Sequence, residues 1–203
     1  IRDTSVTGVQ TCALPICPVR IVQITDTHLY SEESGTLLKM NTKHSFEQVL
    51  ELVRMHDSPP DLILGTGDIA QDASEPAYEY FKSIIGMLNA PFMWLPGNHD
   101  NALLMRSLAE GTSAAHKHMQ LGHWLIVMLD TSVGGQVHGA LSEDELAFLS
   151  AQLEASELSD SVDHILVSMH HNPVKGTAGR MKDIGLQNPR NVWETAKTSK
   201  IGR

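Results

Sequence analysis

The chain has 203 residues, 41% of them hydrophobic, and a formal net charge of −9 at neutral pH. This length and apolar content suffice for one domain with a buried core. The acidic balance argues against attraction to nucleic acid or an anionic membrane surface, and no apolar run reaches the roughly 18–20 residues of a membrane span.

Both ends of the chain read as foreign to the protein. Residues 1–16 match a translated short-read sequencing adapter, and residues 200–203 match the start of one. We therefore expect a single native domain over residues 17–199, truncated at its C-terminus, and we leave the first 16 residues out of the fold. Cys17 is then the one native cysteine, which is typical of a cytoplasmic protein. A natural disordered tail is the alternative at either end.

The first half of the domain alternates strands and helices. Three short apolar runs predict buried strands: residues 20–25, 62–64 and 91–95. Two amphipathic segments between them predict helices: residues 45–55 and a segment that Ser74 can cap. This order is typical of a layered α/β fold.

The second half continues the alternation with a hairpin inserted. The expected elements are a helix over residues 102–108, strands over 116–121 and 124–129 turned at Gly122, a helix that begins at a Ser142–Glu145 capping box, and a strand over 165–169. Beyond them glycines predict a loop, and Leu186 and Trp193 mark a short helix. His138-Gly139 is expected to form a turn before the capped helix.

Polar motifs follow four of the expected strands directly. They are Asp26-x-His28, Gly67-Asp68, Gly97-Asn98-His99-Asp100 and His170. Ligands bind at the carboxyl edge of the strands in α/β sheets, so we expect these motifs to converge on one site. Each motif alone fits an ordinary turn or strand end, whereas the set offers oxygen and nitrogen ligands that suit Mn, Fe or Zn. A carboxylate such as Asp68 can bridge two cations, and a pair of cations activates water and binds phosphate.

This pattern resembles the calcineurin-like metallophosphoesterases, whose motifs run Asp-x-His, Gly-Asp, Gly-Asn-His-Asp/Glu, His and a final Gly-His-x-His. Within that family the chain looks most like the bacterial 3′,5′-cyclic-AMP phosphodiesterases. The longer matching stretches are QITDTHL (23–29), TGDIAQD (66–72), WLPGNHD (94–100) and HGALSEDELAFL (138–149). The resemblance covers about residues 18–193 and implies a layered α-β-β-α sandwich that is incomplete at its C-terminus.

The resemblance also implies roles for individual residues. Those that would hold two divalent metal ions are Asp26, His28, Asp68, Asn98 and His170. Those that would bind substrate are His28, Asp68, Asn98, His99 and His170. The catalytic pair would be His99, which contacts the phosphate and protonates the leaving oxygen, and Asp100, which hydrogen-bonds His99 and favours its protonated form. A metal-bridging hydroxide would attack phosphorus.

Two choices near the site stay open in the sequence. His170 is preferred to its neighbour His171 because the family's ligand ends its strand directly, but the two are adjacent. Gln71 and Asp72 either support the site or only order their loop.

The sequence departs from the family in lacking the final Gly-His-x-His, so one ligand of each metal is missing and we expect this chain to be poorly active. The expected function is hydrolysis of 3′,5′-cyclic AMP, a small nucleotide, with no nucleic-acid or membrane partner. The alternatives are another family member that cleaves a phosphomonoester, a pyrophosphate or a different phosphodiester, and a non-catalytic scaffold. The sequence leaves the metal and the oligomeric state open.

Overall fold

The structure is a computed structural model that describes residues 18–56, 59–174 and 183–198. The segments expected to be foreign, residues 1–16 and 200–203, lie outside the described residues, so that expectation stays a prediction. Gly176 and Gly179 of the expected loop also lie outside them. No helix in the described ranges is long and apolar enough to cross a membrane.

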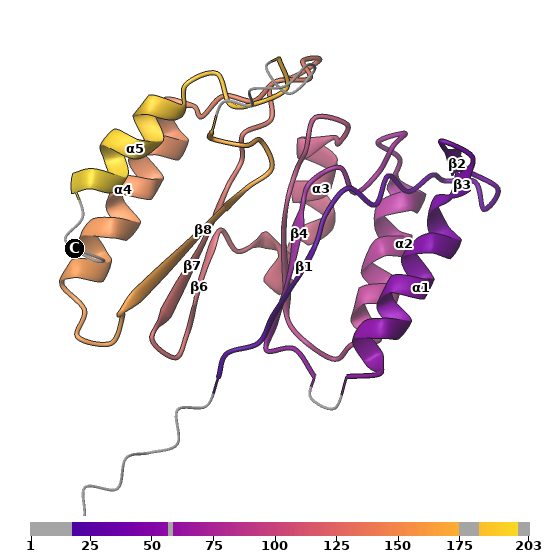
Figure 1. Cartoon of the computed structure of the whole chain (residues 1–203), viewed down its shortest axis with the longest axis horizontal. Helices are drawn as coiled ribbons and strands as arrows, with labels where there is room; N and C mark the ends of the chain where they lie inside the picture. Colours follow the sequence, from indigo (N-terminus) through magenta and orange to yellow (C-terminus); the bar gives the residue numbers. More distant parts are fainter. Residues whose placement is uncertain (1–17, 57–58, 175–182, 199–203) are drawn as a thin grey trace, which may run out of the picture.

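The first sheet is parallel and has the order β1 (Ile21–Ile24), β4 (Leu62–Thr66), β5 (Phe92–Leu95). Its outer face is covered by helices α1 (Thr42–Arg54), α2 (Glu75–Gly86) and α3 (Ala102–Ala109) (Figure 1). The buried helix residues Phe46, Leu50, Phe81 and Met105 belong to one cluster with Ile63 of β4. Helical spacing of apolar residues thus docks each helix on the sheet.

The second sheet has the order β6 (His118–Leu121), β7 (Trp124–Leu129), β8 (His164–Met169). The pair β6–β7 is antiparallel, as expected for a hairpin, and β7–β8 is parallel. Helices α4 (Glu143–Glu157) and α5 (Pro189–Thr198) cover its outer face (Figure 1). The short remaining elements are strands β2 (Thr36–Leu37) and β3 (Met40–Asn41) and the 3-10 turn η1 (Ser113–Ala115).

The two sheets pack face to face. Leu64 and Met93 from the first sheet share a buried cluster with Ile126 and Met128 from the second. Strand β7, apolar on both faces, therefore lies between two cores, as its continuous apolar run indicates. The expected α-β-β-α layering is confirmed.

Several local expectations were wrong. Helix α1 begins at Thr42, before residue 45, because the Asn41 side chain caps it by accepting a hydrogen bond from His44 N. Ser74 makes no side-chain cap, since its hydroxyl donates to Asp72 Oδ1 at 2.6 Å.

The second half holds two further differences. Ser142 does accept the expected hydrogen bond from Glu145 N, but the Glu145 carboxylate accepts from Asp130 N and pairs with Lys117 instead of closing a capping box. Leu186 precedes α5 and forms an isolated bridge with Gly139, so the helix marked by Trp193 starts only at Pro189.

Candidate metal centre

The candidate site lies where β1, β4, β5 and β8 end and four loops meet. Backbone hydrogen bonds join the first two loops: Asp26 N donates to Gly67 O at 3.0 Å, and His28 N donates to Asp68 O at 2.9 Å. The main chain therefore holds the loops beside each other, and the Thr27 hydroxyl adds a hydrogen bond to Ile69 O at 2.8 Å.

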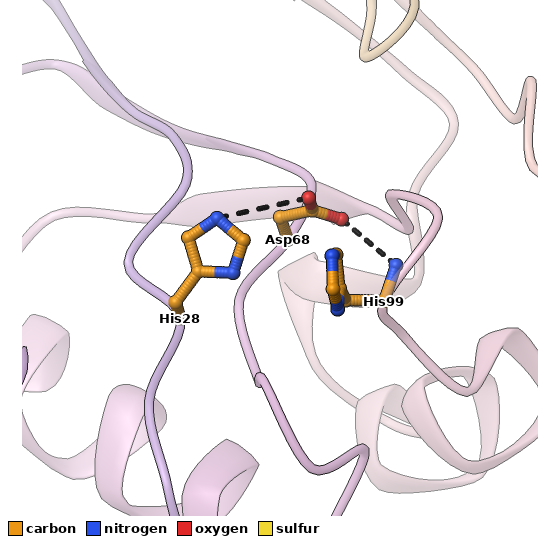
Figure 2. A group of neighbouring side chains, drawn as sticks. All are labelled: His28, Asp68 and His99. Carbon is orange, nitrogen blue, oxygen red and sulfur yellow. Dashed lines mark hydrogen bonds and ion pairs between the residues drawn. The ribbon is translucent and has the colours of Figure 1, made fainter. Parts of the chain in front are cut away.

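Asp68 lies at the centre of this edge, and it is 4% exposed. Its Oδ2 is 3.8 Å from His28 Nε2, and its Oδ1 is 3.5 Å from His170 Nε2. Its Oδ1 also accepts a hydrogen bond from the backbone N–H of His99 at 2.9 Å, and Figure 2 shows Asp68 between His28 and His99. Asp26 joins the group, since its Oδ1 is 3.8 Å from His28 Nε2.

His170 presents a free nitrogen lone pair to Asp68. Its Nδ1 lies 2.9 Å from the carbonyl oxygen of Thr66. A carbonyl only accepts, so Nδ1 carries the proton and Nε2 is left unprotonated on the neutral ring. A second group fixes the nitrogen of a metal-binding histidine in the same way.

His171 lines the same cavity as His170 but is in neither group of candidate ligand atoms among the described residues. It is 3% exposed, and its Nδ1 lies 2.8 Å from Thr131 Oγ1. Its ring rests on Gly139, where an added Cβ would approach Nδ1 to 2.3 Å. The geometry thus favours His170 as the ligand, and the His138-Gly139 turn holds its neighbour.

The donor set fits divalent cations. Two sets of ligand atoms lie within 4.8 Å of one another, one from His28, Asp68 and His99 and one from Asp26, Asp68 and His170. In the described part of the chain, the basic side chains that lie 3.5–3.8 Å from the Asp68 carboxylate are both histidines, neither of which carries a permanent charge. A buried carboxylate without a permanent positive partner is costly, and bound cations would compensate its charge.

Backbone strain is concentrated at the same residues. Asp26, His28 and Asp68 all adopt positive φ, at 55°, 44° and 51°. Non-glycine residues rarely occupy this region, and such strain persists where the surrounding structure enforces it at functional sites. Gly97 permits close approach of the neighbouring loop, because a Cβ there would lie 2.2 Å from Asp68 Oδ1.

Asn98 lies beside these residues on a cavity of about 430 Å³. The cavity is also lined by Asp26, His28, Asp68, His99 and His170, and by the apolar residues Val137 and Ile184. This volume is within the range of small-molecule sites, ~300–1,000 Å³. All five expected ligands and His99 therefore meet at one cavity.

The expected hydrogen bond between Asp100 and His99 is wrong. The Asp100 carboxylate instead accepts hydrogen bonds from the backbone N–H groups of Ile69, Ala70 and Gly97, at 2.9–3.1 Å, and from the Tyr78 hydroxyl at 3.1 Å. Burial raises the pKa of Asp100, although these three N–H donors oppose the rise. Burial and the Asp100 carboxylate likewise raise the pKa of Tyr78. Asp100 thus ties two loops together.

Gln71 takes the place expected of Asp100. Its Nε2 lies 3.0 Å from His99 Nδ1. The sequence had left Gln71 undecided, and the one available signal was its position three residues after Asp68, in the loop that reaches the site. Asp72 has a structural role: it accepts hydrogen bonds from Ser74 in its own loop and from Ser31 N, in the segment after β1, at 2.8 Å.

His171 should make the stability of the fold sensitive to acid. Burial, followed by the nearby His170, lowers its pKa from 6.5 to about 4. The unfolded chain then binds the proton more readily, so the contribution of neutral His171 is complete above pH 6.5 and is lost between pH 6.5 and about 4. We expect His171→Gln to lose roughly 1–2 kcal/mol less unfolding free energy than the wild type between pH 7 and pH 5. Urea unfolding in chelator measures the unfolding free energy of both proteins at each pH, and the difference at pH 8 gives the part that does not depend on pH. If the two unfolding free energies fall in parallel below pH 7, the assignment to His171 is contradicted.

Comparisons with known proteins agree with this geometry. The sequence pattern of a family described as calcineurin-like phosphoesterase matches residues 19–194. The chain is 38% identical over 176 residues to the 3′,5′-cyclic adenosine monophosphate phosphodiesterase CpdA of Pseudomonas aeruginosa, covering 87% of this chain and 63% of that protein. It is 41% identical over 173 residues to the protein of the same name from Escherichia coli strain K12, covering 84% and 61%.

A relative with another named substrate also matches. The chain is 30% identical over 161 residues to a probable glycerophosphodiester phosphodiesterase, GpdQ, of Arcobacter nitrofigilis, covering 76% of this chain and 58% of that protein. The chain therefore spans less than two thirds of the length of these three curated relatives.

Proposed function

The chain belongs to the calcineurin-like phosphoesterase family, and from this premise we propose that its protein is a metal-dependent phosphodiesterase that hydrolyses 3′,5′-cyclic AMP to AMP. The observation that carries the proposal is the convergence of Asp26, His28, Asp68, Asn98 and His170 on one cavity. The two relatives named cyclic-AMP phosphodiesterases support the choice of substrate. A cytoplasmic location, as the cysteine content predicts, is part of the same proposal.

We assign two divalent ions, Fe, Mn or Zn, to the donor set. Asp26 and His28 would hold one ion and Asn98 and His170 the other, with Asp68 shared between them. Such ions, when bound, lower the pKa of a water and offset the charge of a phosphate. His170 Nε2, left unprotonated by the hydrogen bond from Nδ1 to Thr66 O, lies 3.5 Å from Asp68 Oδ1, so this ligand needs no change of tautomer.

His99 would bind the substrate rather than a metal. Its backbone N–H is held by Asp68, and its ring packs edge-on against His28 with centroids 5.0 Å apart. From this position a ring N–H would donate a hydrogen bond to the phosphoryl group. Protonation of the leaving oxygen, as the family resemblance implies, would require the cationic ring. The Asp100 carboxylate, expected to favour that form, accepts its hydrogen bonds from the backbone of Ile69, Ala70 and Gly97 instead.

Replacement of Asn98 tests the proposal. With Mn²⁺, the chain should hydrolyse cyclic AMP slowly but above the metal-free background, and Asn98→Ala should lower this rate by about 10–100-fold or more. Asn191→Ala, at an exposed position on α5, is the matched control and should retain the wild-type rate. Release of AMP, followed by chromatography, measures the reaction.

The outcomes separate the alternatives. Turnover of bis(p-nitrophenyl) phosphate without turnover of cyclic AMP would contradict the cyclic-nucleotide substrate. It would favour another phosphodiester, such as the glycerophosphodiesters named for one relative. Metal binding without turnover of either ester would favour the non-catalytic scaffold.

A further inference from the structure

Gln71 contacts a ring nitrogen of His99, and the contact determines where the ring carries its proton. The amide Nε2 of Gln71 is 3.0 Å from His99 Nδ1. An amide NH₂ group only donates, so Nδ1 must accept. The proton of the neutral imidazole then lies on Nε2.

Hydrogen bonds fix the backbone of Gln71 beside the site. Its N–H donates to Leu29 O at 2.8 Å. The preceding residue, Ala70, forms a parallel bridge with Leu29 and donates its own N–H to Asp100 Oδ1 at 2.9 Å. The Gln71 side chain is half-buried and extends from this fixed backbone to His99.

The other contacts of His99 position the ring but do not determine which of its nitrogens is protonated. Its backbone N–H donates to Asp68 Oδ1 at 2.9 Å. Its ring packs against the His28 ring in a T-shaped arrangement with an interplanar angle of 83° (Figure 2). Neither contact involves hydrogen bonding to a ring nitrogen of His99. Within the described residues, Gln71 makes the hydrogen bond that distinguishes Nδ1 from Nε2.

We propose that Gln71 is a positioning residue that holds His99 in the tautomer whose Nε2–H is available to a phosphoryl oxygen of the substrate. The role in catalysis rests on the proposed function; the tautomer does not. A carboxylate at this position would only accept, and it would draw the proton to Nδ1. The neutral amide keeps the donor on the nitrogen opposite Gln71.

Two variants of similar length separate positioning from packing. Gln71→Glu replaces the donor with an acceptor, and Gln71→Met removes the hydrogen bond while keeping an unbranched side chain. Long-range ¹H–¹⁵N spectra of the metal-free chain at pH 8.5 report the tautomer of His99. We expect Nε2–H in the wild type, Nδ1–H in Gln71→Glu and a mixture in Gln71→Met, with unfolding midpoints close to the wild type.

Kinetics with cyclic AMP and Mn²⁺ give the second readout. The kcat of Gln71→Glu should fall by about 10–100-fold, with a smaller fall for Gln71→Met and little change in KM. An Nδ1–H tautomer in the wild type, or an unchanged tautomer in Gln71→Glu, would overturn the proposal, as would equal kinetics in all three proteins. If the wild type cleaves no cyclic AMP, the proposed function fails and the catalytic role of Gln71 fails with it, while the spectra still decide whether Gln71 sets the tautomer.

Discussion

Asp68→Asn is expected to abolish stabilisation by metal and, in the same protein, to make the metal-free fold more stable. Asp68 belongs to both groups of candidate ligands, so its replacement should weaken the binding of both ions. A ligand at 100 times its dissociation constant adds about 2.7 kcal/mol to the unfolding free energy, and this increment should disappear. Removing either neighbouring histidine alone would leave the other group intact.

The gain in the metal-free state has two physical causes. The substitution removes a charge from a position that is 4% exposed and that has only histidine partners among the described residues. Asparagine also tolerates the φ of 51° at this position better than most residues do, and its carbonyl oxygen can still accept from His99 N. We expect a gain of about 1 kcal/mol in chelator.

Urea unfolding at pH 8, in chelator and in excess Mn²⁺, measures both effects. Asp163→Asn is the matched control, because Asp163 is a surface carboxylate paired with His123, and it should keep the full metal-induced shift. Retention of that shift in Asp68→Asn would remove Asp68 from the metal site. A large loss of metal-free stability would show that its charge supports the fold.

The positions of the candidate ligands could be predicted because they depend on local patterns. Short apolar runs mark where β1, β4 and β5 end, and these parallel strands of one sheet deliver their carboxyl ends to one edge. Strand β8 ends at the same site from the second sheet, where His170 meets Asp68. The residues that follow those runs are therefore neighbours whatever the details of the loops. The layered architecture could be predicted for a similar reason, because apolar residues repeat with a different period in helices and in strands, and the two alternate along the chain.

The partners of those side chains could not be predicted in the same way. His99 and Asp100 are adjacent in sequence, yet the Asp100 carboxylate turns away to the amides of the β4–α2 loop, and Gln71 of that loop reaches His99. Which side chain meets which depends on how two loops cross. Ser74 failed as a cap for a related reason, because Asp72 competes for its hydroxyl.

Asp100→Ala is expected to lower the unfolding free energy by about 3–4 kcal/mol, the largest loss of stability in the loops around the site. The substitution leaves the amides of Ile69, Ala70 and Gly97 and the fully buried Tyr78 hydroxyl without their acceptor. Asp72→Ala is the matched control: this carboxylate also accepts backbone hydrogen bonds, from Ser31 N and Ser74 N, but it is exposed, so water can replace it and the loss should be about 1 kcal/mol or less. Urea unfolding of the three proteins in chelator measures the difference. Equal losses in the two variants would mean that Asp100 does not join the loops and that the position of His99 must be held by other contacts.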